Sequence, residues 1–424
     1  MTPHRPPEPA PSAYGFPLLI RHLLHTPLAH APEQEILSGD RVRYTYRILR
    51  ERIGRLASGL SRLGIGPGDT VAVMDWDSHR YFEAYFAVPM MGAVLHTVNI
   101  RLSPEQILYT INHAEDDIIL VHVDFLPVLA LILGRIERDV RFVLLTDDDA
   151  RPDTPVPFEA EYEEMIAAGD PDHPFEDFDE GTRATTFYTT GTTGLPKGVY
   201  FSHRQIVLHT LGWMSTMGYG SGHATFHRDD VYMPATPMFH VHAWGIPYVA
   251  TLLGVKQIYP GRFLPEKILD LVQRHGVTFT HCVPTILHML LSHPAAARVD
   301  LSRLKMIVGG APMSRGLAKR ALDRGIDVFT GYGLSETCPL LCVSQLDARS
   351  LEGKEEDQIV LRCRTGRPSP LVELRVVDEK GSDVPADGVT TGEVVVRAPW
   401  LTQGYFKEKE RSAELWRGGY LHTG

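Results

Sequence analysis

The chain has 424 residues, of which 43% are hydrophobic and 22% are charged, and its formal net charge is −10. This composition predicts a globular protein of more than one domain, and no basic patch argues for nucleic-acid binding. Four cysteines are too few for a disulfide framework, so we expect free thiols and a cytoplasmic location. The apolar stretch at residues 125–133 is too short to span a membrane, and no secretory signal is found.

The first half of the chain alternates between strand and helix patterns. Six prolines among the first seventeen residues predict an irregular segment over residues 1–25. Thr45 could cap a helix that ends near residue 63, and Ser103 followed by Pro104 marks another helix start. The alternation predicts a parallel sheet covered by helices on both faces. The other expected elements are strands at 71–74, 118–123 and 142–145 and a helix over 80–91.

An acidic stretch interrupts this alternation. Residues 147–180 contain fourteen aspartates and glutamates against a single basic residue, Arg151. Such a composition is typical of a solvated surface, so we expect a linker or loop here and not an interaction tail.

The most specific pattern is the run Tyr-Thr-Thr-Gly-Thr-Thr-Gly-Leu-Pro-Lys-Gly at residues 188–198. Its glycines allow backbone N–H groups to approach a ligand, its hydroxyls add donors, and Lys197 adds a positive charge, so the run suits a polyphosphate. Flanking apolar residues predict a strand on each side. A Walker A loop is excluded, because only two residues separate Gly191 from Gly194 and Lys197 precedes a strand. A flexible surface hairpin is the alternative.

The run resembles the signature of the adenylate-forming (AMP-binding) superfamily, which includes acyl-CoA synthetases, luciferases and the adenylation domains of peptide synthetases. The resemblance implies that a carboxylic acid is activated with ATP to an acyl-adenylate and pyrophosphate and is then passed to a thiol. It also implies that the loop closes over the β- and γ-phosphates, with Lys197 as a catalytic residue. The loop residues expected at the nucleotide are Thr189, Thr190, Gly191, Thr192, Thr193 and Gly194.

Beyond this loop the strand and helix patterns resume and then change. Strands are expected at 231–233, 255–259, 277–281, 304–308 and 326–330, and later at 371–377 and 393–397, between turn-forming glycines and prolines. The resemblance implies an α/β fold class with two α/β/α subdomains over residues 26–344 and a small distorted β-barrel over residues 345–424.

A second pattern, Tyr-Gly-Leu-Ser-Glu at residues 332–336, follows an expected strand, where ligands of parallel sheets usually bind. If this pentapeptide is considered alone, the alternative interpretation is an ordinary turn. The resemblance implies that Tyr332 stacks on adenine, that Ser335 replaces the usual Thr at the α-phosphate, and that Glu336 holds Mg²⁺ as a catalytic residue. Thr189 is a second candidate ligand, and one carboxylate suffices for this ion. The resemblance extends the nucleotide site to Gly310, Ala311, Pro312, Gly331, Gly333 and Leu334.

A third pattern, Pro-Met-Phe-His-Val-His-Ala-Trp-Gly, spans residues 237–245. The resemblance implies that His240 lies near the carboxylate being activated and that Trp244 is an aromatic gate, for which simple core packing is the alternative. His240, His242 and His281 have a spacing that a metal could use, but no nearby cysteine or carboxylate completes such a site. We therefore expect His242 to be a surface or packing residue. The acyl-substrate site is expected to comprise His240, Trp244, Gly309 and Gly333.

Together these patterns predict an AMP-forming acid–thiol ligase that uses ATP, Mg²⁺ and coenzyme A. The predicted acid is a medium- or long-chain fatty acid, and an aryl or branched acid is the alternative. A non-catalytic nucleotide-binding protein would be expected to lack Lys197 or Glu336, and both are present. A kinase-like phosphotransferase would need Walker or protein-kinase motifs, which are not found. A homodimer is expected, because dimers are common among the fatty-acyl members.

The chain stops at Gly424. In the superfamily this point is followed by an aspartate that binds the ribose and by a mobile C-terminal domain that carries a catalytic lysine. That domain is absent from this sequence. We therefore expect the chain to be the large N-terminal part of an enzyme, able to bind ATP or an acyl-adenylate but turning over poorly.

Overall fold

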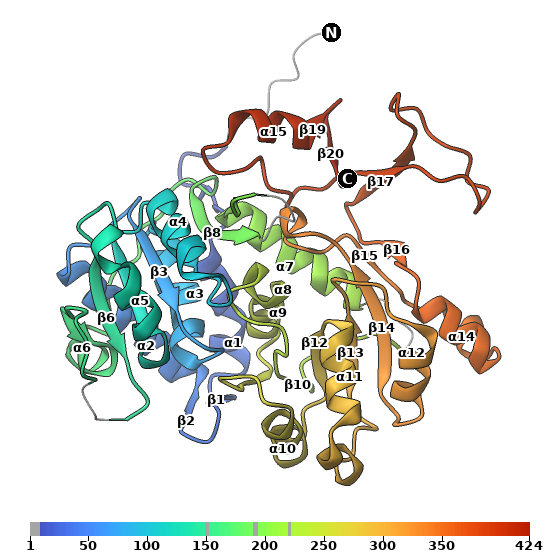
Figure 1. Ribbon diagram of the computed structural model, residues 1–424, viewed down its shortest axis with the longest axis horizontal. Coiled ribbons are helices and arrows are strands. Elements are labelled where there is room, and N and C mark those ends of the chain that lie inside the picture. The colour runs from blue at the N-terminus through green and yellow to red at the C-terminus, as the bar shows by residue number, and fades with distance from the viewer. Residues whose placement is uncertain (1–8, 149–151, 190–193, 219–221) are drawn as a thin grey trace.

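The computed structural model describes residues 9–148, 152–189, 194–218 and 222–424. Two large sheets with helices on their faces make up most of the molecule, and a small antiparallel sheet lies at the top of the view in Figure 1. The predicted α/β fold with two sheet layers and a smaller β subdomain is confirmed. Within the described ranges, no helix is both long and apolar enough to cross a bilayer.

The first large sheet has seven strands in the order β7-β6-β5-β3-β4-β8-β9, and it is parallel except for β9, which pairs antiparallel with β8. The mostly apolar strands predicted near residues 71, 118 and 142 are its centre. Its strands are β3 (Thr70–Met74), β4 (Val94–Thr97), β5 (Ile118–His122), β6 (Arg141–Leu145), β7 (Ala160–Glu161), β8 (Arg183–Thr189) and β9 (Lys197–Ser202).

The second large sheet has nine strands in the order β16-β15-β14-β13-β12-β10-β11-β1-β2. It is parallel from β14 to β1, and antiparallel pairs extend both of its edges. Its strands are β1 (Glu35–Ser38), β2 (Val42–Thr45), β10 (Val231–Tyr232), β11 (Lys256–Tyr259), β12 (Phe279–Cys282), β13 (Lys305–Val308), β14 (Asp327–Tyr332), β15 (Cys342–Val343) and β16 (Arg367–Pro368).

Helices cover both faces of each large sheet. Ser103 caps α4 with a complete capping box and Thr45 caps α2, as their positions predicted. The helices are α1 (His25–His30), α2 (Tyr46–Arg62), α3 (His79–Met90), α4 (Pro104–Ala114), α5 (Leu126–Ile132), α6 (Tyr162–Ala168), α7 (His203–Gly218), α8 (Val241–Trp244), α9 (Ile246–Leu253), α10 (Pro265–His275), α11 (Pro284–Ser292), α12 (Arg315–Leu322), α13 (Ala348–Leu351), α14 (Glu355–Arg362) and α15 (Lys409–Leu415).

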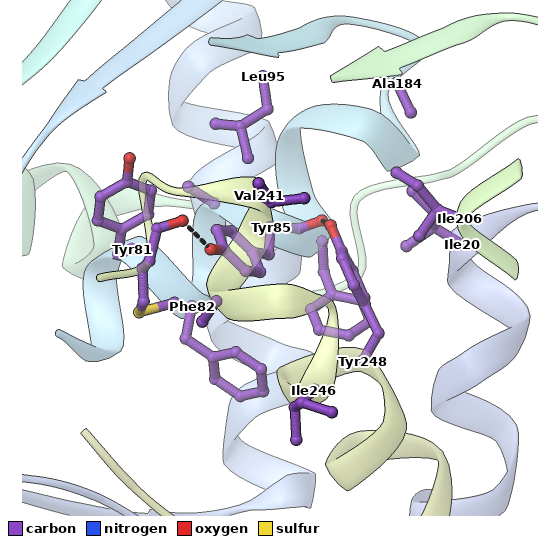
Figure 2. Packing of buried hydrophobic residues seen from close by; sticks show 14 of the residues in the cluster. Ile20, Tyr81, Phe82, Tyr85, Leu95, Ala184, Ile206, Val241, Ile246 and Tyr248 are labelled. Atoms are coloured by element: carbon purple, nitrogen blue, oxygen red, sulfur yellow. Dashed lines mark hydrogen bonds between the residues drawn. The ribbon is translucent and has the colours of Figure 1, made fainter. Parts of the chain in front are cut away.

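Helix α3 lies between the two large sheets. Every one of its residues is buried, and it contacts β3 and β8 of the first sheet and β1 of the second. A helix without an exposed face is stable only in such an enclosed layer. Its aromatic side chains form the centre of the largest hydrophobic cluster, together with residues from α8 and α9. Figure 2 shows this packing for Tyr81, Phe82, Tyr85, Val241, Ile246 and Tyr248.

The small sheet consists of β17 (Glu373–Val377), β18 (Glu393–Arg397), β20 (Tyr420–His422) and β19 (Trp416–Arg417), in that order. Its first strand, β17, begins at Glu373. Strand β16 and helices α13 and α14 precede it, and β16 pairs with β15 in the nine-stranded sheet. This pairing extends the nine-stranded sheet along the chain as far as Pro368.

Two expectations for local structure were wrong. The acidic stretch was predicted to be a linker or loop, but it contains β7 and α6, and Tyr162, Met165 and Ile166 of α6 are buried. The N-terminal segment was expected to be irregular as far as residue 25, yet Ile20–Leu24 forms a short 3-10 helix with its apolar side chains in the core. In both places a few buried apolar residues outweigh the surrounding polar or Pro-rich composition.

A buried carboxylate connects α6 to the central helix. Glu83 of α3 is fully buried, and it accepts hydrogen bonds from the hydroxyls of Tyr44 at 2.9 Å and Tyr162 at 2.7 Å. Arg52 of α2 lies 2.7 Å from the same carboxylate and also pairs with Glu163 at 2.8 Å. A buried charge is tolerated here because the hydrogen bonds and the ion pair to these partners offset its loss of solvation.

Removal of Glu83 should therefore destabilise the folded state. We predict that Glu83→Ala lowers the free energy of unfolding by about 3 kcal/mol, because it leaves Arg52 and two buried hydroxyls short of a partner. Urea denaturation measures the change. The matched control is Glu105→Ala, which removes an exposed pair with Arg135 and should cost less than about 1 kcal/mol. Equal losses in the two variants would contradict the role of Glu83.

Candidate active site

The predicted phosphate loop lies in a hairpin between β8 and β9. Thr189, the last residue of β8, pairs directly with Lys197, the first residue of β9. The hairpin therefore places the hydroxyl-bearing and the cationic ends of the loop side by side. Gly194 is exposed and has a φ of +128°, which a residue with a side chain rarely adopts. Thr190, Gly191, Thr192 and Thr193 lie outside the described residues.

A small cavity brings the second and third sequence patterns together. Its volume is about 70 Å³, and it lies at the carboxyl ends of β13 and β14. Residues far apart in the chain meet here because the carboxyl ends of neighbouring parallel strands share one edge of the sheet. The predicted residues that line it are His240, Trp244, Gly309, Gly310, Gly331, Tyr332, Gly333, Leu334 and Ser335.

The turn after β14 requires glycine at position 333. A Cβ atom there would lie 1.4 Å from the carbonyl oxygen of Pro339, so no other residue fits without moving the backbone. Thr337 holds the same turn closed, accepting from the N–H of Leu334 at 2.9 Å and donating to the carbonyl of Pro339 at 2.7 Å. Tyr332 and Glu336 are both held by this turn, and each is only partly exposed.

Trp244 packs against the backbone of the cavity wall. Its side chain is 6% exposed, and a Cβ on Gly309 would lie 3.2 Å from its ring. Its ring also lies 5.0 Å from that of His281, between centroids. Glycine at position 309 thus makes room for the indole at this place.

The residues that lead to Trp244 form a left-handed turn. Val241, His242, Ala243 and Trp244 all have φ between 48° and 59°. This conformation costs about 1–2 kcal/mol for each non-glycine residue. His242 is not at the surface: it is fully buried among aromatic rings, and burial lowers the pKa of its imidazole to about 3. The expectation of a packing role for His242 agrees with this placement.

Three side chains from the first half of the chain hold the turn that carries His240. Asp77 accepts from the N–H of Met238 at 2.7 Å, and Thr97 donates to the carbonyl of Phe239 at 2.9 Å. Tyr85 of α3 donates to the carbonyl of Met238. The seven-stranded sheet and its central helix thus fix a turn whose side chains face a cavity of the other sheet.

His240 itself is exposed to solvent but closely surrounded by protein. Loss of solvation, with a further contribution from the positive charge of Arg101, lowers the pKa of its imidazole. The side chain is therefore favoured in its neutral form, which can donate or accept a hydrogen bond.

A second cavity of about 370 Å³ adjoins the first, because Leu334 lines both. Lys197 and Glu336 face this second cavity together with Tyr405 and residues of the small sheet. The hydroxyl of Tyr405 donates to Glu336 Oε1 at 2.7 Å, and Lys197 Nζ lies 3.5 Å from the same hydroxyl. The structure thus brings a lysine and a carboxylate from distant parts of the chain to one tyrosine.

Not every predicted site residue reaches these cavities. Ala311 and Pro312 are exposed and do not line the first cavity, although Gly310 beside them does. Conversely, no sequence pattern indicated Trp213, Leu340 and Cys342, which line the cavity from α7 and from the segment after the Tyr332 turn. Tyr405 was not among the predicted site residues, and its contacts depend on a strand pairing that sequence reasoning did not anticipate.

A larger cavity of about 1380 Å³ lies elsewhere. It is an open, polar groove that contains none of the predicted site residues. Its charged side chains largely satisfy one another, as in the 2.7 Å pair of Arg80 and Asp147. The smaller cavities, in which the sequence patterns converge, therefore form the candidate active site.

Comparisons with known proteins identify the family to which the chain belongs. A family model described as AMP-binding enzyme matches residues 24–406. The chain belongs to this family of AMP-binding enzymes, and its predicted reaction, activation of an acid as an adenylate followed by transfer to coenzyme A, is that of the acyl-CoA ligases in the family.

Individual relatives support the same assignment. The chain is 41% identical over 391 residues to a long-chain-fatty-acid–CoA ligase of Thermus thermophilus. This match covers 91% of the present chain and 70% of the relative. It is 36% identical to a 3-methylmercaptopropionyl-CoA ligase of Ruegeria lacuscaerulensis, over 96% of this chain and 76% of that protein. Its fold is similar to the N-terminal domain of FACL13 from Mycobacterium tuberculosis, with a TM-score of 0.80, 24% identity, and coverage of 96% and 95% of the two chains.

The glycine at position 333 gives a direct test of the site. We predict that Gly333→Ala displaces the turn that carries Tyr332 and Glu336 and lowers acid-dependent pyrophosphate release on the order of a hundredfold. Gly316→Ala is the matched control, because nothing lies within 4 Å of a Cβ at that position. Similar rates for the two variants would show that the turn is not part of the site.

Asp77 should make stability depend on pH. Burial, with a contribution from Asp75, raises its pKa to about 7, whereas an unfolded aspartate has a pKa of about 4. Between these values the folded state binds a proton that the unfolded state has lost, so the free energy of unfolding falls as the pH rises. Asp77→Asn should remove this contribution while keeping an oxygen acceptor for Met238. Urea denaturation across this range checks it, and parallel pH profiles for the two proteins would contradict it.

Proposed function

We propose that this chain activates a medium- or long-chain fatty acid with ATP and that the resulting acyl-adenylate is converted to a coenzyme A thioester. The observation that carries the proposal is the convergence of His240, Trp244 and the Tyr332–Glu336 turn at two adjoining cavities, one of which also contains Lys197. An apolar cavity next to a polar one matches a substrate that is apolar at one end and reacts with a polyphosphate at the other.

The proposed reaction needs no nucleophile from the protein. The substrate carboxylate attacks the α-phosphorus of ATP, and pyrophosphate leaves. The protein then has to position the reactants and neutralise charge on the phosphates. Lys197 and the hairpin between β8 and β9 would bind the β- and γ-phosphates, and Ser335 would contact the α-phosphate.

The residues present fit a magnesium ion bound with the nucleotide. Mg²⁺ prefers oxygen ligands and is usually held by one or two carboxylates plus phosphate oxygens and water. Glu336 offers a partly exposed carboxylate in the polar cavity, and the hydroxyl of Thr189 is the second candidate ligand. The ion would offset the negative charge of the triphosphate during the attack.

The apolar cavity would receive the acid, with Trp244 as its gate. A volume of about 70 Å³ has room for about two water molecules, too little for a long acyl chain. Trp244 would therefore have to move away from Gly309 before such a chain enters. His240 would lie at the carboxylate end, where its neutral imidazole can donate a hydrogen bond.

The remaining expectations are part of the same proposal. Coenzyme A would be the thiol acceptor, the protein would act in the cytoplasm, and a homodimer is its proposed assembly. No nucleic-acid partner is proposed.

A pyrophosphate-release assay across acids of increasing chain length tests the proposed function. We expect the rate to rise toward medium and long chains and Glu336→Gln to lower it by at least about a hundredfold, because the charge that offsets the triphosphate is lost. Glu373→Gln removes an exposed carboxylate on the small sheet and serves as the control. A flat response to fatty acids with a strong response to aryl acids would favour the aryl-acid alternative.

A further inference from the structure

Tyr405 lies between the two charged side chains to which catalytic roles are proposed. Its side chain is 8% exposed, and its hydroxyl donates to Glu336 Oε1 at 2.7 Å. Lys197 Nζ lies 3.5 Å from the same oxygen and 4.7 Å from the centroid of the tyrosine ring. The lysine thus meets both the hydroxyl and the π-face of one residue, and the carboxylate meets the hydroxyl.

The backbone around Tyr405 is fixed to both of the segments that it bridges. Tyr405 forms an antiparallel bridge with Val199 of β9, and the N–H of Phe406 donates to the carbonyl of Gly198 at 2.8 Å. On the other side, the N–H of Thr402 donates to the carbonyl of Glu336 at 2.9 Å. The segment 402–406 therefore joins the strand that begins with Lys197 to the turn that carries Glu336.

A phenol is well suited to this position. It has one proton to donate and lone pairs to accept, so it can donate to a carboxylate while it accepts from an ammonium group. A tyrosine hydroxyl keeps its proton at physiological pH, so it remains a donor to Glu336.

We propose that Tyr405 is a positioning residue that holds Lys197 and Glu336 in the arrangement needed to bind ATP together with Mg²⁺. Its hydroxyl donates to Oε1 of Glu336, so the other carboxylate oxygen would be available to the ion. Its ring and oxygen restrict the rotamers of the Lys197 side chain. An unrestricted lysine would sample many rotamers and would lose that conformational entropy on binding phosphate. This inference rests on the proposed roles of Lys197 and Glu336.

The test is Tyr405→Phe, which keeps the ring and removes only the hydroxyl. We expect the KM for Mg-ATP and the half-saturating Mg²⁺ concentration to rise about tenfold, because a hydrogen bond to a charged group is lost. The KM for the acid and the thermal midpoint should stay within twofold and within a few degrees of wild type, respectively. Tyr420→Phe is the matched control, since Tyr420 donates to the exposed Glu373 on the small sheet.

A double substitution separates this inference from the proposed function. In a Glu336→Gln background, Tyr405→Phe should change the Mg²⁺ dependence no further, because the carboxylate that it positions is gone. If Tyr405→Phe leaves the KM for Mg-ATP unchanged or lowers it while Glu336→Gln still impairs the enzyme, the positioning role is wrong and the proposed function stands. If Glu336→Gln itself has no effect, the proposed function fails.

Discussion

Burial of α3 between two sheets is the constraint on which the rest of the molecule depends. Each sheet supplies an apolar face, and the helix between them has no face left for solvent. The carboxylate of Glu83, near the middle of the helix, is satisfied by two tyrosines and by Arg52. The partners come from β2, α2 and α6, so the burial of one carboxylate specifies how three other elements pack.

The same helix also reaches the candidate active site. Tyr85 on α3 and Asp77 just before it hold the backbone of Met238, and Thr97 at the end of β4 holds Phe239. The cavity that receives His240 lies on the other sheet, at the ends of β13 and β14. The position of the proposed acid site therefore depends on how the two sheets pack. The position of the proposed phosphate site depends on the small subdomain, whose segment 402–406 joins Lys197 to Glu336.

Sequence reasoning succeeded where a pattern is local. The helix starts at Thr45 and Ser103, the apolar strands, and the hairpin between β8 and β9 depend on residues close together in the chain. The family motifs also led to most of the cavity's lining. Sequence-based prediction failed where a few buried residues determine the structure against the local composition. In α6, three side chains are buried although residues 147–180 contain fourteen acidic residues. Prediction also missed Trp213 and Tyr405, since nothing in their own segments shows which distant side chains they contact.

The left-handed turn from Val241 to Trp244 links the packing around α3 to the candidate active site. Four consecutive side-chain-bearing residues in this conformation could not persist as an isolated peptide, and β-branched Val241 is especially disfavoured there. Strain of this kind persists only where the surroundings over-determine the backbone. All four side chains are buried, and Figure 2 shows Val241 enclosed with Tyr85 and Tyr248 in the central cluster. The energy gained by packing around α3 thus offsets a strained turn, and that turn brings both His240 and Trp244 to the lining of the same cavity. A loss of packing at α3 would accordingly relax the turn and disturb the acid site without touching either residue.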